Sequence, residues 1–365
     1  VLQFATINFD LSVEEIFSTI LSGATLVLYP GQKIDSMSLF LACCDQYRIT
    51  LLTLTTAYWN EFTVYLLAEK ASLPDCIRLV IFGGEQANPS LVAAWLEQMG
   101  DQARLINDYG PTEATVVVSH QDLTPPAERW RNLRDIPIGR PIANVQVFIL
   151  DERLQPVPVG MPGEICIGGA GVGRGYLNQP ELTAEKFIPD PFSHLSGARL
   201  YRTGDLGYFQ EDGSIVMTRR MDQQIKLHGF RIEPGEVEKN LLQHPDLAAA
   251  VVLLRTSPGV EKVLAAYVVP RPGANPTPLA LRDFLRSKLP GFSVPSAYIR
   301  LDSLPLKPNG KVAHDLLPQP EAASFPGQSD YQPPRTPLEE KLTRAWSQVL
   351  GLERIGVHEA AAVPG

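Results

Sequence analysis

The sequence predicts a multidomain α/β protein, and three features of its 365 residues support this prediction. Strand-like apolar runs alternate with helix-like segments over about the first 110 residues, as they do in layered α/β folds. Residues 111–221 contain short apolar runs separated by Gly and Pro turns, which is typical of a small β-rich unit. A further α/β unit follows, and a stretch rich in Pro, Ser, Gly and Gln separates it from a last amphipathic helix. We therefore expect divisions at residues 1–221, 222–318, 319–337 and 338–365.

The individual elements follow from local patterns. We expect helices over residues 13–21, 89–99 and 236–245, the second of them beginning at Asn88 as N-cap. We expect strands over residues 24–30, 77–85, 145–150, 163–169, 248–254 and 264–270. The four prolines in residues 270–278 predict a surface loop.

Composition excludes several classes of protein. The net charge of -8 disfavours a nucleic-acid surface, which needs clustered Lys and Arg. No apolar run approaches the ~18 residues that span a bilayer, and no signal peptide precedes the first apolar stretch. The four cysteines form no metal-binding spacing and are typical of a reducing compartment, so we expect a cytoplasmic protein: Cys43, Cys44, Cys76 and Cys166. The first residue, Val1, falls directly into an apolar pattern, and we expect the chain to begin inside a domain.

Three short loops carry residue types that bind nucleotides. The segment NDYGPTEAT, residues 107–115, joins an aromatic ring, a hydroxyl and a carboxylate that could stack a base, bond a phosphate and hold Mg²⁺. In YRTGDL, Asp205 follows a glycine turn and could accept hydrogen bonds from sugar hydroxyls, and PNGKV presents Lys311. Taken one at a time, each loop is more typical of a surface turn, a strand end or a solvated lysine.

The glycine-rich stretch GGAGVGRGY, residues 168–176, does not predict a dinucleotide-binding fold. That motif needs a following helix and an acid ~20 residues further on, whereas LNQPELTAEKF follows here with Pro180 interrupting it. We interpret these glycines as tight turns at positive φ. The sequence has no GxxxxGK[ST] motif, so we expect any phosphate-cradling glycine loop to lie outside this chain.

The order and spacing of the motifs are more specific than any one motif. The segments FDLSVEEIFSTILSGATLVL, NDYGPTE, GEICIGGAGVGRGYLNQPELTAEKF, YRTGDLG, RRMDQQIKLHGFRIEPGEVE and NGKV resemble the successive signature blocks of nonribosomal peptide synthetase adenylation domains, which belong to the adenylate-forming superfamily. The resemblance covers residues 1–318, and PRTPLEEKLTRAWSQVLGLERIGV resembles the start of a peptidyl carrier domain. It implies the C-terminal part of the large adenylation subdomain over residues 1–221 and the small mobile subdomain over 222–318. A linker over 319–337 and a truncated carrier start over 338–365 would follow.

The resemblance implies ATP- and Mg²⁺-dependent activation of an amino acid as its adenylate. The product would pass to the phosphopantetheine thiol of a carrier domain. Tyr109 would stack on adenine, Asn107 would contact the adenine edge, and Asp205 would accept from the ribose hydroxyls. Thr112 would contact the α-phosphate and Glu113 would bind Mg²⁺.

Further roles follow from the later motifs. Arg220 matches a nucleotide-contacting arginine, and Asp222 matches the hinge of the small subdomain. Lys311 matches the lysine that bridges the substrate carboxylate and the phosphate, where its charge would stabilise the reacting phosphorus. Five positions depart from the usual family residues: Met217, Arg219, Pro234, Ala313 and His314.

The resemblance also implies an amino-acid pocket. Asp10 would hold the α-ammonium group, and eight further residues would choose the side chain: Leu11, Glu14, Ala57, Ile81, Gly83, Asp108, Val116 and Val117. Glu14 and Asp108 have no basic pocket residue to pair with, and unpaired buried carboxylates are unfavourable. We therefore expect a cationic substrate such as lysine, ornithine or arginine; the alternative is that one acid faces solvent on the surface of its helix.

Two other functions stay open at this point. One is an acyl-CoA or aryl-acid ligase of the same superfamily, which Asp10 and the carrier-like helix disfavour. The other is a non-catalytic remnant, because neither the family's phosphate loop nor the phosphopantetheine-bearing serine is found in this sequence. We expect carrier and condensation domains as partners, with no nucleic acid and no membrane, and little activity from the chain alone.

Overall fold

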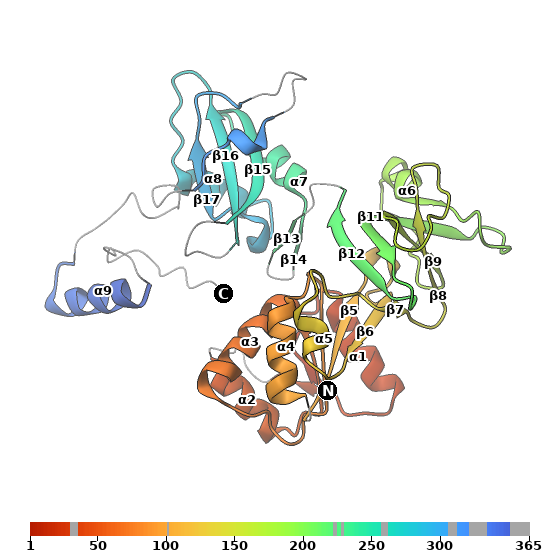
Figure 1. The fold of residues 1–365 in the computed structure, drawn as a ribbon. Coiled ribbons are helices and arrows are strands. Elements are labelled where there is room, and N and C mark those ends of the chain that lie inside the picture. Colours follow the sequence, from red (N-terminus) through yellow and green to blue (C-terminus); the bar gives the residue numbers. More distant parts are fainter. Residues whose placement is uncertain are drawn as a thin grey trace. The chain divides into compact units, whose positions relative to one another are not determined.

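The computed structural model describes residues 1–29, 36–100, 102–221, 225–227, 230–256, 262–305, 312–320 and 334–350 (Figure 1). The chain divides into two compact units, Val1–Asp222 and Gln223–Gly365. Asp222 and Lys311, to which the sequence assigns the hinge and the reactive lysine, lie outside the described residues. Within those ranges, we find no helix long and apolar enough to cross a membrane.

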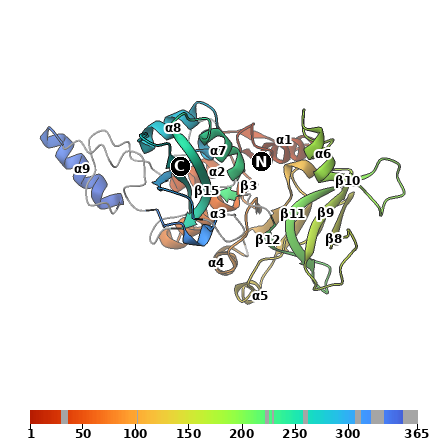
Figure 2. The ribbon, with the colours of Figure 1, turned by 90° about the horizontal axis from the view of Figure 1, so that it is seen from above.

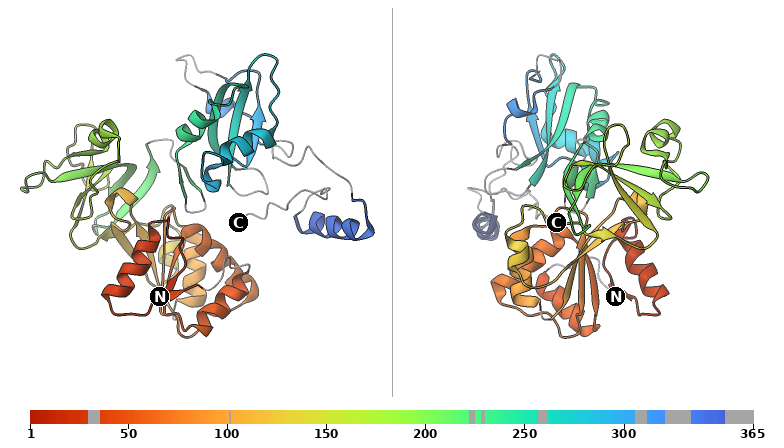
Figure 3. Two further views of the ribbon diagram at one scale, coloured as in Figure 1. Left: turned by 180° about the vertical axis from the view of Figure 1, so that it is seen from behind. Right: turned by 45° about the vertical axis from the view of Figure 1, so that its right-hand side comes forward.

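A five-stranded mixed sheet forms the centre of the first unit. Its order is β3 (Leu51–Thr55), β4 (Leu79–Gly83), β5 (Arg104–Tyr109), β6 (Ser119–Leu123) and β7 (Arg140–Pro141). The first three strands are parallel, and β6 and β7 continue the sheet antiparallel. Figure 3 shows the red helix α1 (Leu11–Leu21) on one side of the sheet and the orange helices on the other: α2 (Met37–Gln46), α3 (Thr56–Glu69) and α4 (Pro89–Met99).

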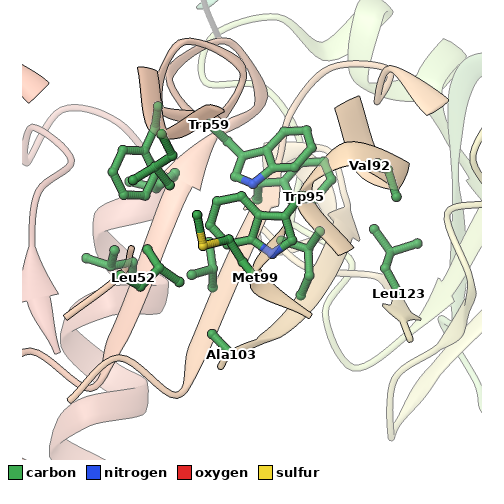
Figure 4. Close-up of a cluster of buried hydrophobic side chains, with 14 of the residues drawn as sticks. Leu52, Trp59, Val92, Trp95, Met99, Ala103 and Leu123 are labelled. Carbon is green, nitrogen blue, oxygen red and sulfur yellow. The ribbon is translucent and has the colours of Figure 1, made fainter. Parts of the chain in front are cut away.

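Aromatic side chains fill the layer between this sheet and α2–α4 (Figure 4). Trp59 stacks on Phe82 with ring centroids 4.1 Å apart, and Trp95 packs 5.9 Å from Trp59. Each such ring buries on the order of 150–250 Å², so this cluster dominates the stability of the layer. The predicted N-cap of α4 is confirmed, because the Asn88 side chain accepts hydrogen bonds from the next turn.

Helix α1 has an unusual polarity. Its buried face is polar and contains Ser12, Glu15 and Thr19, whereas Phe17 and Leu21 are 58% and 85% exposed. The fully buried Glu15 carboxylate accepts hydrogen bonds from the backbone N–H groups of residues 4 and 5 at 3.2 Å, which ties α1 to the end of β1 (Leu2–Gln3). Burial raises the pKa of Glu15 to about 7.

A second sheet completes the first unit. Its order is β10 (Phe187–Pro189), β11 (Arg199–Phe209), β9 (Gly163–Gly169) and β8 (Val145–Leu150), and β12 (Ile215–Arg220) also pairs with β11. Figure 2 shows these strands side by side, with α6 (Pro180–Lys186) near β10. The predicted strands 145–150 and 163–169 are confirmed as β8 and β9. The short helical turns α5 (Glu128–Arg131) and η1 (Thr112–Ala114) lie in loops of this unit.

The second unit has its own small core. The hairpin β13 (Ile225–Leu227) and β14 (Phe230–Ile232) precedes the sheet β15 (Leu247–Thr256), β16 (Lys262–Pro270) and β17 (Ala297–Arg300). Helices α7 (Pro234–Leu241) and α8 (Pro278–Arg286) contribute to one apolar cluster with this sheet. The turns η2 (Gly291–Ser293) and η3 (His314–Leu316) and the last helix α9 (Pro337–Leu350) complete the described elements.

The segment 312–320 is held by two side chains of the second unit's sheet. Arg255 donates to the carbonyl of His314 at 2.7 Å, and the Tyr267 hydroxyl donates to the carbonyl of Pro318 at 2.6 Å. A backbone hydrogen bond of 2.8 Å from Ala313 to Pro305 joins the segment 312–320 to the end of the segment 262–305.

The strand expected over 77–85 is shorter in the structure, and the strands expected over 248–254 and 264–270 are longer, as the bounds of β4, β15 and β16 show. Three further predicted elements are wrong in extent. The helix expected over 13–21 begins at Leu11, directly after Asp10. The strand expected over 24–30 is reduced to β2 (Val27–Leu28), because its partner β1 offers only two residues. The helix expected over 236–245 runs over Pro234–Leu241, since proline is favourable at a first helical position and Pro245 disfavours helix in the residue before it.

Candidate active site

The motif residues of the first unit gather beyond the carboxyl ends of the parallel strands. Asn107, Asp108 and Tyr109 end β5, and Gly83 ends β4 directly beside Asp108. Ligands of open α/β sheets bind at this edge. Gly83 is required here because a Cβ atom would lie 2.5 Å from the backbone oxygen of Asp108.

A tight loop connects β5 to β6. The Val118 N–H donates to the Tyr109 carbonyl at 2.8 Å, and a Cβ on Gly110 would lie 2.0 Å from the Val116 carbonyl. The loop closes through two consecutive non-glycine residues at positive φ, Thr115 (63°) and Val116 (66°). A β-branched residue in this conformation is strained, and such strain is concentrated at functional sites.

Tyr109, Asp205 and Arg220 form one buried cluster. The Tyr109 hydroxyl donates to Asp205 Oδ2 at 2.6 Å, and Arg220 Nη1 donates to Asp205 Oδ1 at 2.6 Å. Burial and the neighbouring Asp205 charge raise the pKa of Tyr109 well above its usual range, so the phenol keeps its proton. The structure thus brings together three residues that the sequence assigns to nucleotide binding, with Arg220 holding the acid.

An irregularity in β11 explains the position of Asp205, the last residue of the TGD motif at 203–205. The register with β9 shifts between Arg202 and Leu206, so that the motif leaves the regular ladder. Thr203 Oγ1 donates to a carbonyl of β9 at 2.7 Å and accepts from the Asp205 N–H at 2.9 Å. Gly204 takes a φ of 72°, and its N–H donates to Glu164 at 3.1 Å. Thr203 and Glu164 therefore support the bulge, and sequence reasoning missed both of them.

Asn107 is buried, and its side-chain amide donates to the Pro137 carbonyl at 3.0 Å. This contact fixes the plane of the Asn107 amide. The amide nitrogen serves as the donor to Pro137, and the side-chain oxygen can act as a hydrogen-bond acceptor.

Asp10 and Thr112 are in direct contact although they are 102 residues apart in the chain. Thr112 Oγ1 donates to Asp10 Oδ2 at 2.5 Å. Asp10 stands at the N-cap position of α1 but makes no capping hydrogen bond with its side chain. This contact joins two predicted roles, because Asp10 is expected to hold an ammonium group and Thr112 is expected to contact a phosphate.

Glu113 is fixed by the glycine-rich stretch. The Tyr176 hydroxyl donates to Glu113 Oε1 at 2.6 Å, and the Gly173 N–H donates to the Glu113 carbonyl at 2.8 Å. Thr115 Oγ1 donates to the Gly171 carbonyl at 2.6 Å. The interpretation of these glycines as positive-φ turns is correct for Gly169 and Gly175. Gly171 and Gly173 have no positive φ and instead allow close approach, since a Cβ there would lie 2.8 and 3.0 Å from carbonyls of the 112–115 turn.

Glu14 and Asp108 form a second acidic group. Burial and the Asp108 charge raise the pKa of Glu14 to about 8, and burial raises the pKa of Asp108 to about 7. Glu14 Oε2 and Asp108 Oδ1 are buried without a hydrogen-bond partner among the residues that the structure describes. The other residues assigned to the pocket are half-buried and come from four segments of the unit: Leu11, Ala57, Ile81, Val116 and Val117.

Two family models match this chain. Residues 1–177 match the AMP-binding enzyme family, and residues 236–311 match the AMP-binding enzyme C-terminal domain. The chain belongs to the AMP-binding enzyme family.

Relatives of this AMP-binding chain include large peptide synthetases. Malpibaldin synthetase of Mortierella alpina is 40% identical over 349 residues, which are 96% of this chain and 6% of that synthetase. Tyrocidine synthase 1 of Brevibacillus parabrevis is 38% identical over 356 residues, covering 98% of this chain and 31% of the relative. The AMP-binding chain thus spans a small part of the length of these relatives.

A solved structure shows the same fold. Holo-PA1221, an NRPS protein containing adenylation and PCP domains bound to a vinylsulfonamide inhibitor, is 27% identical with a TM-score of 0.76. The match covers 97% of this chain and 57% of that chain. The predicted α/β class, with a large unit and a small C-terminal unit, is confirmed for this AMP-binding enzyme.

The chemistry of the site fits Mg²⁺ and a nucleotide. Among the described residues, no group of three or more His, Cys, Asp or Glu side chains could hold a metal ion. Mg²⁺ needs no such group, because it binds through one or two carboxylates together with phosphate oxygens. Glu113 can supply such a carboxylate, and Asp205 supplies a buried acceptor for hydroxyl groups beside the Tyr109 ring.

The departures from the family pattern fit the AMP-binding fold. Met217 packs against the apolar core of the second sheet, Arg219 is exposed, and Pro234 occupies the first turn of α7. Ala313 is buried, and His314 begins η3.

Proposed function

We propose that this chain provides the amino-acid-activating site of a nonribosomal peptide synthetase. The observation that carries the proposal is the contact between Asp10 and Thr112. A carboxylate that binds an ammonium group is needed by an enzyme for amino acids, and not by one for simple or aryl acids. Its contact with Thr112, which we propose to bind the α-phosphate, supports a site in which the two substrates of adenylate formation would lie next to each other.

In the proposed reaction, a carboxylate oxygen of the amino acid attacks the α-phosphorus of ATP. A new P–O bond forms, the bond to the β-phosphate oxygen breaks, and pyrophosphate leaves with the displaced electron pair. Asp10 holds the ammonium group, Thr112 donates to an α-phosphate oxygen, and Lys311 stabilises the negative charge that develops there. Tyr109 and Asn107 orient the adenine, and Asp205, fixed by Arg220, binds the ribose. This positioning makes the in-line attack effectively intramolecular.

Mg²⁺, held by Glu113 and the phosphates, would neutralise phosphate charge when bound. In the second half-reaction, a phosphopantetheine thiol of a partner carrier domain attacks the acyl carbon, and AMP leaves. Rotation about Asp222 would exchange the Lys311 loop for a thiolation surface between the two steps. We assign the last helix α9 to the start of such a carrier domain, with a condensation domain as a further partner.

We also propose that the substrate is a cationic amino acid. Glu14 and Asp108 have buried, unpartnered oxygens among the described residues, and burial disfavours the ionised form of each carboxyl group and raises its pKa. A lysine, ornithine or arginine side chain would pair with both acids and remove this unfavourable burial. The other pocket residues, Leu11, Ala57, Ile81, Gly83, Val116 and Val117, would line the aliphatic part of the side chain.

Amino-acid-dependent ATP–pyrophosphate exchange by the full-length protein tests the proposal. We expect exchange with one basic amino acid, and a loss of about 10²-fold or more in Lys311→Ala. The same variant should still pass a preformed adenylate to the carrier thiol. Lys239→Ala removes an exposed lysine of the same unit and should be silent.

Three results would count against the proposal. Exchange driven only by aryl or fatty acids would favour the related ligases, and absence of exchange with any acid would favour a non-catalytic remnant. Preference for leucine, valine or phenylalanine would contradict only the cationic substrate.

A further inference from the structure

Tyr176 links the glycine-rich stretch directly to the site. Its hydroxyl donates to Glu113 Oε1 at 2.6 Å, within the range of a short charge-assisted O–H···O⁻ bond. The sequence motif contains this tyrosine, but its role could not be read from the glycines that precede it.

The tyrosine is itself held in place. Its backbone N–H donates to Thr183 Oγ1 of α6 at 2.9 Å, and its ring packs edge-on against Phe187 with centroids 5.4 Å apart. Gly175 has a φ of 133°, and a Cβ there would lie 2.3 Å from Thr183 Cγ2. Only glycine at this position lets the tyrosine backbone approach the threonine so closely.

The backbone of Glu113 is fixed by the same stretch. Gly173 donates to the Glu113 carbonyl at 2.8 Å. Arg199 in turn donates to the carbonyls of Gly173 and Arg174 at 2.9 and 2.8 Å. Both ends of the glutamate, its peptide group and its carboxylate, are therefore anchored to the second sheet through one segment of chain.

We propose that Tyr176 is a positioning residue that sets the orientation of the Glu113 carboxylate for the metal ion of the bound nucleotide. The inference rests on the proposed function, in which Glu113 binds Mg²⁺. A glutamate side chain has several rotatable bonds, and a hydrogen bond to one oxygen leaves far fewer orientations for the group. Loss of an outer partner of a metal-binding carboxylate typically lowers metal affinity about 10–100-fold.

The test measures binding rather than turnover. Calorimetry would follow α,β-methylene-ATP binding to the full-length protein over a series of Mg²⁺ concentrations, with metal-free AMP as a second ligand. In Tyr176→Phe, we expect the Mg²⁺ concentration for half-maximal binding to rise about 10-fold or more, while AMP affinity changes less than about threefold. Tyr208→Phe removes a hydroxyl from β11 of the same unit and should leave both unchanged.

A double-mutant cycle separates positioning from a general structural effect. In a Glu113→Gln background, Tyr176→Phe should have no further effect on the Mg²⁺ dependence, because the group it positions is gone. Thr183→Val, which loosens the tyrosine without removing its hydroxyl, should give a smaller shift in the same direction.

Each outcome is decisive. An unchanged Mg²⁺ dependence in Tyr176→Phe, or an equal shift in the Glu113→Gln background, would overturn the inference and leave the proposed function intact. If the wild-type protein bound no nucleotide at all, the proposed function would fail, and the inference with it. If Tyr176→Phe unfolded, the Thr183→Val variant would decide the question alone. It should raise the Mg²⁺ concentration for half-maximal binding, and this rise should be absent in the Glu113→Gln background.

Discussion

The Tyr109 hydroxyl and the Asp205 carboxylate are joined by a buried hydrogen bond of 2.6 Å across 96 residues of sequence. The remaining oxygen of Asp205 accepts from Arg220 at 2.6 Å. The orientation of this acid is thus fixed by protein contacts, so a nucleotide binding at the proposed site would not have to order it.

The first prediction concerns Arg220. Its side chain and that of Asp205 are only 15% and 3% exposed, so Arg220→Met leaves a buried carboxylate with one partner fewer. We expect the free energy of unfolding to fall by about 3–5 kcal/mol, measured by urea denaturation followed by tryptophan fluorescence. Arg104→Met breaks an ion pair to Asp122 whose side chains are 66% and 36% exposed, and should change stability by about 1 kcal/mol or less. Equal effects of the two substitutions would contradict this account of the cluster.

The second prediction is the pH dependence of substrate binding. Because a cation pairs with ionised carboxylates, the affinity for lysine or ornithine should rise from about pH 6 to about pH 8.5 as Asp108 and then Glu14 lose their protons. An apolar amino acid should show the opposite trend. Glu14→Gln should flatten the upper part of the profile and weaken the basic substrate by about 1–3 kcal/mol. The Michaelis constant in the exchange assay, measured across this range, reports both effects, and a profile without slope would be evidence against the acid pair.

The third prediction concerns Glu15 and stability. Its folded pKa of about 7 lies above the ordinary value of 4.5, so between these values the folded protein binds more protons than the unfolded chain. The free energy of unfolding contributed by this group is therefore highest below about pH 4.5 and decreases as the pH rises through 7. Glu15→Gln keeps the shape and removes the titration, so its stability should vary less with pH over this interval. Chemical denaturation at several pH values measures the difference, and parallel curves for both proteins would refute it.

The fourth prediction tests the closed β5–β6 loop. Gly110→Ala places a methyl group about 2.0 Å from the Val116 carbonyl, and the neighbour is backbone that cannot rotate away. We expect loss of about 3 kcal/mol or more of stability, together with loss of nucleotide binding. Gly235→Ala, in α7, meets no atom within 4 Å and should be neutral or stabilising by up to about 1 kcal/mol. Thermal unfolding of the two variants gives the comparison, and a Gly110→Ala protein as stable as the wild type would show that the loop can close differently.

Motif order in the sequence predicts that Tyr109, Asp205 and Arg220 serve one nucleotide site. The structure places the three side chains in one cluster, and their roles toward a nucleotide stay predictions. The sequence was insufficient for supporting residues. Thr203 and Tyr176 are ordinary residues in their local context, and their roles depend on a strand bulge and on a close approach of two loops that no local pattern encodes. The short extent of β2 likewise depends on its partner strand.

The positive φ of Val116 has a consequence for experiments that alter the proposed amino-acid pocket. A library at this position varies two quantities together, the shape of the proposed pocket wall and the tolerance of the backbone for a left-handed conformation. Glycine or asparagine at residue 116 would be enriched because both tolerate a positive φ, whatever substrate was offered. This enrichment could be misinterpreted as selection for substrate recognition. Variation at Ala57 or Ile81, which lie on a regular helix and a regular strand, separates recognition from folding more cleanly.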